Sequence, residues 1–541
     1  MKKQLAAAAL SFGLLGAVMT SPANGNDGWG GKKKIKHVLL ISVDGMHALD
    51  VANYVKNHKG SALAELAGHG ITYSNAQTPA NSDSFPGLLA LVTGGTPLSH
   101  GLFYDVSYNR AIFDPTNPTC QGQAGNMQVF DESIDVYDSN NVSQNKIDAT
   151  KLPHYINAQG KCAVFFPHNA MQTNTIFEVV KANGGRTAWE DKHPAYDITN
   201  GPSGQGVDDL YTPEVTNFGG FDNTVSVVCT ANNDELKVIG ILNEIKGLTH
   251  DGKPVGKVPA VFGMNFQAVS VGQKLSIDNK AGGCTADTDA TINGQPGGYL
   301  DGTGAPTAVL GFALNYVDGA LARMIKGLKA AGIYDSTLFI VSAKHGQTPI
   351  NPVKTNKPGH FADLVAALPG ASTDPGALAI AAANNCSTGP CGFVQDDDIA
   401  LVWFGFGDQG KTAAATAFLN SNANALFIDE VLSGEEIKLK FRDPLTDSRT
   451  PDILVRPTYG TVYTGSTAKN AEHGGFNYSD TNVGLIVSNP EFDARVVKTP
   501  VTTAQVAATL LQALGIDPSE LDAVRKEGTV VLPFASDREE E

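Results

Sequence analysis

Three uninterrupted apolar runs constrain the fold of this chain more than any other feature of its sequence. They span residues 38–43 (VLLISV), 338–341 (LFIV) and 483–488 (VGLIVS). A strand that is buried on both faces needs such a run, and strands of this kind occur in parallel sheets that helices cover. Residues 309–331 and 503–514 carry apolar side chains at helical spacing. We therefore predict an α/β fold with a central, mostly parallel sheet and helices on both of its faces.

The first 23 residues have the pattern of a signal peptide. A basic start at Lys2 and Lys3 precedes an apolar run at 5–19, which is short for a bilayer crossing, and small residues follow at 21–23. A membrane anchor is the alternative. No later stretch of the sequence reaches the length of a transmembrane segment, so we predict a secreted or periplasmic protein.

The rest of the sequence is organised as one large domain with insertions. We place the main α/β domain at residues 35–520. Glycine- and asparagine-rich surface insertions are expected within about 105–305, and a smaller second lobe at about 351–470. Residues 521–541 are expected to form a C-terminal tail.

The cysteine content agrees with export. Six cysteines in an exported chain predict disulfide bonds rather than reactive thiols. Six cysteines allow 15 pairings, which the sequence does not resolve. We favour a local bond between Cys386 and Cys391, because the Gly-Pro step between them can turn the chain back.

The net charge limits the class of partner. The chain has 55 acidic and 39 basic residues and a formal net charge of −16. A field of this sign repels nucleic-acid polymers, so we do not expect such a partner. A small anionic substrate is compatible with the charge, because a bound metal ion can reverse the local potential. The oligomeric state is left open.

Two potential metal ligands directly follow two of the apolar runs. Asp44 comes after the first run, and His345 follows the run at 338–341 after a short connection. Ligands of open parallel sheets collect at the carboxyl ends of the strands. We therefore expect a metal or substrate site there; an aspartate that caps a turn and a histidine satisfied in the core are the alternatives.

Ser84 is expected to lie at the beginning of a helix. Pro86 suits a first helical turn, and Gly94 and Gly95 can end the helix after residues 88–93. At such a helix N-terminus, free backbone N–H groups and the helix dipole attract phosphate. The alternative is that Ser84 serves only as the N-cap.

Six short motifs occur in a fixed order along most of the chain. They are Val43-Asp44-Gly45, Ser84-Phe85-Pro86, Leu91-Val92-Thr93-Gly94, Ser99-His100-Gly101, Lys344-His345-Gly346 and Glu472-His473-Gly474-Gly475. The ordered set, from about residue 37 to 516, resembles the nucleotide pyrophosphatase/phosphodiesterase (type I phosphodiesterase) branch of the alkaline phosphatase superfamily. The resemblance implies that Ser84 attacks phosphorus and forms a covalent phospho-enzyme intermediate, which water then hydrolyses. It also implies two zinc sites, one that includes Asp44, Ser84 and His345 and another that includes His473.

The sequence departs from this family at several ligand positions. Lys344 stands where the family has a metal-binding aspartate, and Asp105 stands at the position of its phosphate-binding asparagine. The family's remaining aspartate and histidine ligands should fall within residues 262–273, a segment without acidic residues or histidine. Our alignment of that segment places Val269 and Gln273 at the two positions.

These departures predict one metal ion in place of two. We expect a divalent ion, zinc for preference, held by Asp44, Ser84, His345 and His473. The Lys344 ammonium would replace the charge of the second ion, because a lysine is a compact cation with three hydrogen-bond donors. The alternative is that Lys344 points away and pairs with an acid.

Neutral and acidic side chains around this site are candidates for substrate contacts. We expect Asp105, Asn265 and Gln273 to bind substrate, with Gln267 as a further neutral candidate; a buried amide in a strand is the alternative for the amides. His193 is a weaker candidate for the substrate pocket, with a surface loop as the alternative.

The predicted function is that of an exported, metal-dependent phosphodiesterase or nucleotide pyrophosphatase acting on a small anionic phosphoester. A catalytically inactive relative that serves as a binding protein is the first alternative. A sulfatase is the second, but residues 84–88 lack the arginine that formylglycine formation requires. The leaving group, the preference for monoesters or diesters and the identity of the metal stay open.

Overall fold

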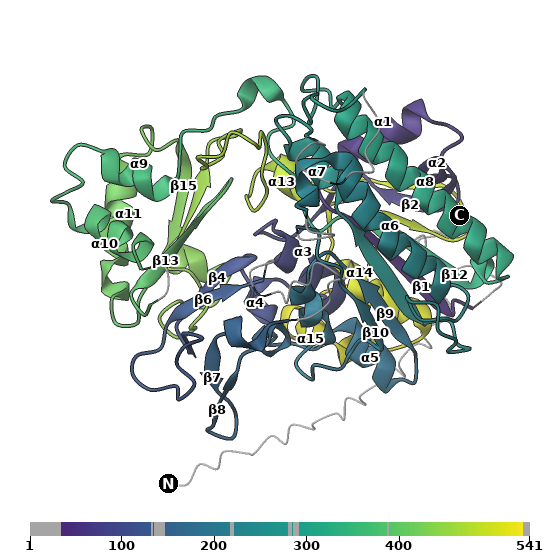
Figure 1. Cartoon of the computed structure of the whole chain (residues 1–541), viewed down its shortest axis with the longest axis horizontal. Coiled ribbons are helices and arrows are strands. Elements are labelled where there is room, and N and C mark those ends of the chain that lie inside the picture. Colours follow the sequence, from purple (N-terminus) through teal and green to yellow (C-terminus); the bar gives the residue numbers. More distant parts are fainter. Residues whose placement is uncertain are drawn as a thin grey trace, which may run out of the picture.

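The computed structural model describes residues 34–130, 134, 147–216, 221–279, 284, 291–386 and 389–533. The predicted signal peptide at residues 1–23 lies outside this part of the chain. The main body is built on an eight-stranded sheet (Figure 1). Its strands, in the order in which they lie side by side, are β10 (Asp209–Tyr211), β9 (Thr187–Glu190), β11 (Val261–Phe266), β1 (His37–Val43), β12 (Thr337–Ser342), β17 (Ile486–Ser488), β2 (Gly70–Tyr73) and β18 (Arg495–Val497).

The predicted α/β architecture with a mostly parallel sheet is confirmed. The five strands from β10 to β12 run parallel, and β1 lies between β11 and β12 with all but its first residue fully buried. The third apolar run differs from the expectation. It forms only the three-residue strand β17, which is antiparallel to both of its neighbours. Val483, at the start of that run, instead forms an isolated bridge with His47.

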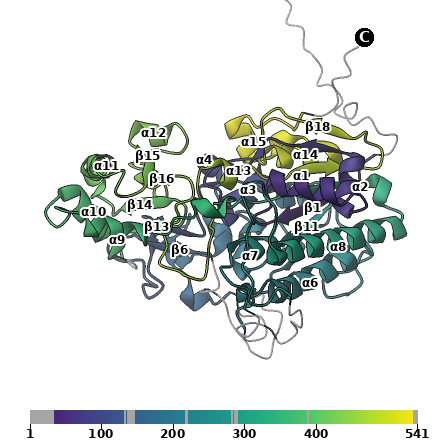
Figure 2. The same ribbon diagram turned by 90° about the horizontal axis from the view of Figure 1, so that it is seen from above.

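Helices cover both faces of the sheet (Figure 2). Along β1, Leu39 and Ile41 pack into one apolar cluster, and Val38 and Leu40 pack into another on the opposite face. Helices on the first face are α1 (Ala48–Asn57), α2 (Ala62–Gly68), α6 (Val227–Glu244), α7 (Ala268–Lys274) and α8 (Ala308–Ala330). Helices on the second face are α3 (Ser84–Thr93), α5 (Ile176–Ala182) and α14 (Gln505–Leu514).

Helix α8 has the length and hydropathy to cross a bilayer, and within the described residues no other helix does. Its apolar side chains have a place in the core of the main body, because Leu310, Leu321 and Met324 are buried in the same cluster as Leu39 and Ile41.

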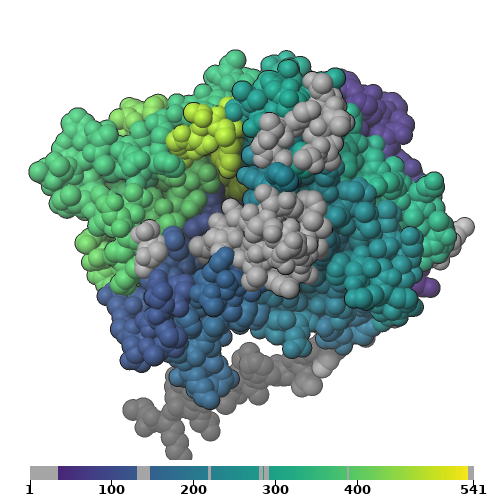
Figure 3. Space-filling view, viewed as in Figure 1, coloured from purple at the N-terminus to yellow at the C-terminus, as the bar shows by residue number. Residues whose placement is uncertain are grey.

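A second, smaller lobe lies beside the main body and is coloured green in Figures 1 and 3. It has its own apolar cluster and an antiparallel sheet. The sheet consists of β13 (Gly392–Asp396), β14 (Ala400–Phe404), β16 (Ile453–Pro457) and β15 (Ile428–Ser433), and its helices are α9 (Phe361–Ala367), α10 (Pro375–Asn384) and α11 (Thr412–Ser421).

Residues 105–305 form more than surface insertions. They include the hairpin of β4 (Val106–Asn109) and β6 (Asn126–Val129), but they also supply β9, β10, β11 and α6 to the main body. Within the expected C-terminal tail, residues 522–527 form the helix α15 (Asp522–Glu527) next to α3.

Three disulfide bonds join the six cysteines. They are Cys120–Cys162, Cys229–Cys284 and Cys386–Cys391. The favoured local pair is therefore present, and the structure resolves the other two pairings that the sequence left open.

Candidate active site

Ser84 is the first residue of α3, a helix buried along its whole length. The N-cap is Asp83, whose side chain accepts a hydrogen bond of 3.1 Å from the Phe85 backbone N–H. The alternative of Ser84 as the N-cap is therefore wrong. We expected free backbone N–H groups at this helix N-terminus, but the Phe85 N–H is already bonded to Asp83 and is not available to a phosphate.

A glycine allows α3 to lie against the chain segment that follows β12. A Cβ atom on Gly87 would lie 2.0 Å from the backbone oxygen of Lys344. That oxygen also accepts a hydrogen bond of 2.7 Å from the Thr78 hydroxyl. This close approach brings Ser84 next to His345, which follows Lys344 in the chain.

The Ser84 hydroxyl lies between an imidazole and an ammonium group. Ser84 Oγ is 3.2 Å from His345 Nε2 and 3.3 Å from Lys192 Nζ. The other ring nitrogen, His345 Nδ1, is 2.9 Å from the backbone oxygen of Gly346 and must donate to it. In this tautomer Nε2 carries no proton, so it accepts the hydrogen bond from the Ser84 hydroxyl. Burial lowers the pKa of His345 to about 3 despite the nearby Asp44 carboxylate, so the ring is neutral at neutral pH.

Asp44 directly follows β1 and provides a buried carboxylate of the site. Its Oδ2 accepts hydrogen bonds from Lys192 Nζ at 2.9 Å and from Asn265 Nδ2 at 3.1 Å. Its Oδ1 has no hydrogen-bond partner among the described residues and lies 3.9 Å from His345 Nε2. Burial opposes ionisation, but Lys192 and Lys344 hold the pKa of Asp44 well below its usual range.

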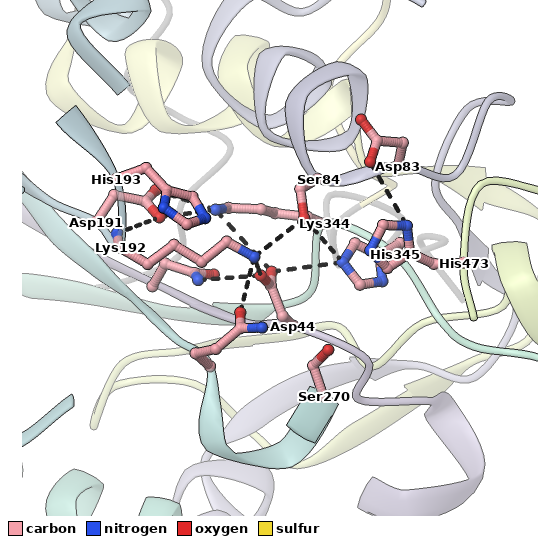
Figure 4. A network of polar contacts seen from close by, with 12 residues as sticks. Asp44, Asp83, Ser84, Asp191, Lys192, His193, Ser270, Lys344, His345 and His473 are labelled. Atoms are coloured by element: carbon pink, nitrogen blue, oxygen red, sulfur yellow. Dashed lines mark hydrogen bonds and ion pairs between the residues drawn. The ribbon is translucent and has the colours of Figure 1, made fainter. Parts of the chain in front are cut away.

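Lys192 is the residue of the site that the sequence analysis missed. It follows β9 by two positions and is almost fully buried. Its ammonium donates to Asp44 Oδ2, to Ser84 Oγ and, at 2.8 Å, to Gln267 Oε1. Burial opposes the charge, but Asp44 raises the pKa of Lys192 above its ordinary value, so the side chain is an ammonium at neutral pH. Figure 4 shows it reaching Ser84 and Asp44 from one side, with His345 and His473 on the other.

Lys344 contacts an acid, as the alternative interpretation proposed, but stays close to Asp44. Its ammonium donates to both oxygens of Asp191, at 2.9 and 3.0 Å, and to the Tyr196 hydroxyl at 2.9 Å. It lies 4.0 Å from Asp44 Oδ1 and is fully buried, and burial lowers its pKa. Lys344 therefore contributes charge near the site without touching Ser84.

His473 lies beside His345, with ring centroids 4.0 Å apart. Its Nδ1 is 3.5 Å from Asp83 Oδ2, and neither atom has a hydrogen-bond partner among the described residues. Burial lowers the pKa of His473 well below its ordinary value. Burial and the neighbouring Asp105 raise the pKa of Asp83 well above its usual value. The structure thus brings Asp44, Ser84, His345 and His473 together at one edge of the sheet.

The predicted substrate contacts divide into two groups. Asn265, the penultimate residue of β11, donates to Asp44, and Gln267 after the strand accepts from Lys192. Gln273 points elsewhere: its amide donates at 2.8 Å to the Gly45 backbone oxygen and to the Tyr299 hydroxyl. Val269 packs in the apolar core. Asn265 and Gln267 are therefore the residues of this segment that contact the site, and Gln267 lies two positions before Val269, which our alignment chose.

A cavity of about 880 Å³ opens next to Gln267. Its polar lining includes Asp105, His193, Gln267, Lys274 and Lys469. His193, for which a surface loop was the alternative, is bound to the buried Glu214 carboxylate at 2.8 Å. The cavity is large enough for a small organic phosphoester, and through Gln267 it adjoins the Lys192 ammonium.

The residues present do not fit the metal centre that the sequence resemblance implies. The Oδ2 atom of Asp44 is already occupied by the Lys192 ammonium and the Asn265 amide. A cation that bound both Asp44 and Ser84 would lie against that ammonium, which is 2.9 and 3.3 Å from the same two residues. Within the described part of the chain, no three His, Cys, Asp or Glu side chains gather into a metal-binding group.

The chain matches one family model. Residues 38–197 and 310–477, more than half of the chain, match the model of the type I phosphodiesterase / nucleotide pyrophosphatase family. A comparison with curated protein sequences finds no match.

Two solved structures share the fold. Murine ectonucleotide pyrophosphatase / phosphodiesterase 5 has a TM-score of 0.52 and 15% sequence identity, over 90% of this chain and 96% of that chain. An inactive variant of the same murine protein, in complex with AMP, has a TM-score of 0.51 and 14% identity, over 89% of this chain and 96% of that chain. At this identity the likeness concerns the fold alone.

Proposed function

The chain belongs to the type I phosphodiesterase/nucleotide pyrophosphatase family and is a hydrolase of phosphoric ester or phosphoanhydride bonds, and we propose that it cleaves these bonds through the Ser84 hydroxyl. The observation that carries the proposal is the position of Ser84 Oγ between His345 Nε2 at 3.2 Å and Lys192 Nζ at 3.3 Å. A serine hydroxyl is a weak nucleophile until a neighbouring base or cation activates it. Ser84 has both.

In the proposed reaction the serine oxygen attacks phosphorus and displaces the leaving oxygen. The product is a phosphoryl group, with any retained substituent, bound covalently to Ser84. Water then attacks the same phosphorus and releases the serine. The family generally depends on divalent metal ions, but no step is assigned to such an ion here, because the donor set around Ser84 does not fit one.

The proposed substrate is a small phosphodiester or nucleotide-like anhydride. The cavity beside Gln267 supports this size class, and Lys274 and Lys469 on its wall supply positive charge although both also contact Glu472. The AMP complex of the murine relative supports a nucleotide-like compound. The net negative charge of the chain supports a small anion over a nucleic-acid polymer.

We place this activity outside the cytoplasm. The signal-peptide pattern of the first 23 residues and the three disulfide bonds support export.

The test is a comparison of wild type and Ser84→Ala on chromogenic phosphodiesters, phosphomonoesters and sulfate esters. We expect the wild type to cleave phosphoesters, and the variant to lose at least about 10³-fold in kcat. Ser82→Ala is the matched control: this buried serine donates to the Gly475 backbone oxygen at 3.0 Å and should keep its activity.

Undiminished turnover by Ser84→Ala would contradict the nucleophile assignment. Cleavage of sulfate esters alone would favour the sulfatase alternative. A wild type that binds nucleotides but cleaves none of the three classes would favour the binding-protein alternative.

A further inference from the structure

The cation that touches the nucleophile in this protein is a lysine. The three N–H bonds of the Lys192 ammonium match three acceptors, Asp44 Oδ2 at 2.9 Å, Gln267 Oε1 at 2.8 Å and Ser84 Oγ at 3.3 Å. Each N–H of the ammonium group therefore has an acceptor, and burial restricts the movement of the side chain. A fixed, desolvated charge next to the reacting oxygen is the arrangement by which an active site stabilises developing negative charge.

Both ammonium groups of the site are already paired with carboxylates. The Lys192 ammonium pairs with the Asp44 carboxylate at 2.9 Å, and the Lys344 ammonium pairs with the Asp191 carboxylate at 2.9 Å. A divalent ion added between Asp44 and Ser84 would face both ammonium groups across a buried space. An ion there would therefore need Lys192 to withdraw or to lose its proton.

His345 is arranged as a base toward Ser84. Its Nδ1 proton is held by the Gly346 backbone oxygen at 2.9 Å, and its Nε2 lone pair faces the Ser84 hydroxyl at 3.2 Å. The same lone pair would be needed to bind a metal ion, so it cannot serve both purposes at once. The existing hydrogen bonds match the serine–histidine pairs of metal-free hydrolases.

From this geometry we infer that Lys192 replaces the metal ion at the nucleophile, that His345 is the general base, and that the protein hydrolyses phosphoesters without a divalent ion. The inference rests on the proposed function. As the bond from Ser84 Oγ to phosphorus forms, the serine proton passes to His345 Nε2 and the bond from phosphorus to the leaving oxygen breaks. The leaving oxygen departs on the side of phosphorus opposite Ser84 and takes a proton from solvent water, while His345 keeps the serine proton.

The second half of the reaction uses the same groups. Water attacks phosphorus from the side opposite Ser84 and loses a proton to solvent, the bond to Ser84 Oγ breaks, and the His345 imidazolium returns its proton to Ser84. Lys192 stabilises the negative charge on Oγ in both directions. One ester and one water yield one phosphoric acid product and one alcohol, with no other reactant.

The first experiment measures metal content and activity in the same sample. The full-length wild type is treated with EDTA and 1,10-phenanthroline and dialysed, bound metals are quantified by mass spectrometry, and phosphoester turnover is measured before and after. After chelation the protein should contain far less than one metal ion per chain, and we expect its turnover to differ less than about twofold from that of the untreated protein. Loss of turnover that is restored by Zn²⁺ would overturn the inference, whereas absence of turnover before chelation would contradict the proposed function instead.

The second experiment replaces the charged side chain of Lys192 with an uncharged one. Lys192→Met keeps the length of the side chain and should lower kcat about 10²–10³-fold, with Lys181→Met as the control, because Lys181 is 42% exposed and pairs with Asp208. The variant's fold is checked by its unfolding midpoint. Turnover by a folded Lys192→Met equal to wild type would overturn the role of Lys192.

A third readout does not depend on activity. We expect calorimetric zinc titrations of the wild type and of Asp44→Ala to be the same, because the wild type should have no zinc site that depends on Asp44. Lys192→Ala, which frees Asp44 Oδ2 and Ser84 Oγ, should gain zinc affinity. One tight, Asp44-dependent zinc site in the wild type would overturn the inference even for a protein without measurable turnover.

Discussion

Two lysines of equal charge act differently at this site because their partners differ. Lys192 shares its hydrogen bonds between a carboxylate, an amide and the reactive hydroxyl of Ser84. Lys344 gives its hydrogen bonds to Asp191 and Tyr196 and acts on Asp44 only through space, at 4.0 Å. The contact with the hydroxyl, and not the charge alone, makes Lys192 the catalytic cation in this account.

Another residue-scale contact predicts the behaviour in acid. Burial alone would raise the pKa of Glu214, but the His193 ring at 2.8 Å and the Thr216 N–H at 3.0 Å lower it below the usual value of 4.5. A carboxyl whose folded pKa is depressed stabilises the fold above its unfolded pKa, and this stabilisation is lost as the pH falls below about 4.5.

We predict that Glu214→Gln lowers the free energy of unfolding by about 1–3 kcal/mol at neutral pH. Below pH 4.5 the variant should depend less on pH than the wild type. Urea unfolding at neutral pH and at several lower values measures both. If the unfolding free energies of the two proteins changed with pH in parallel, the pKa of Glu214 would not be lowered in the folded state.

At the scale of elements, the packing of α3 against the chain after β12 sets the position of the nucleophile. A Cβ on Gly87 would meet the Lys344 backbone oxygen at 2.0 Å, so Gly87→Ala forces the helix and the His345 segment apart. We predict a loss of about 1–3 kcal/mol in unfolding free energy and a fall in kcat, because the hydrogen bond between Ser84 and His345 lengthens.

The control for this prediction is Gly311→Ala in α8, where a Cβ meets nothing within 4 Å. It should keep wild-type activity and be as stable or more stable, since alanine favours a helix over glycine. Equal kcat for Gly87→Ala and the wild type would show that α3 can shift without moving Ser84.

Some strands of the sheet are predictable from the sequence, and others are not. Strands β1 and β12 are predictable because they are buried on both faces and therefore apolar throughout. Strand β9 is a four-residue strand, Thr-Ala-Trp-Glu, without such a run, so nothing local marks Lys192 as a neighbour of Asp44. That contact depends on β9 reaching the same edge of the sheet through its pairing with β11.

The sequence analysis placed Gln273 in the site as a substrate-binding residue, and the path of the chain after β11 explains why this prediction is wrong. Gln267 faces the site because it directly follows β11, and the segment then turns into α7, which carries Gln273 away toward Gly45 and Tyr299. To choose between the two glutamines, one had to know that β11 ends at Phe266 and that α7 begins at Ala268, and element boundaries are the least certain part of a sequence-based prediction.

At the scale of the whole molecule, the disulfide bonds differ greatly in how far apart along the sequence their two cysteines lie. Cys120–Cys162 joins residues 42 positions apart, and Cys386–Cys391 joins residues 5 apart. In the chain-entropy model a bond that closes the longer loop restricts the unfolded chain more.

We therefore predict that Cys120→Ser with Cys162→Ser lowers the unfolding free energy by about 2–4 kcal/mol, and that Cys386→Ser with Cys391→Ser lowers it by less. Calorimetric or urea unfolding of the two double variants makes the comparison. A larger loss for the short loop would contradict the chain-entropy account of these bonds.

The most direct test of the central claim is to trap the covalent intermediate. The wild type is mixed with a chromogenic phosphodiester, quenched in acid within the first turnover, digested and analysed by peptide mass spectrometry. We expect the peptide containing Ser84 to gain the transferred phosphoryl group with its retained substituent, and we expect no such gain in Ser84→Ala. A wild type that turns over the diester while the adduct forms on another residue would contradict this claim.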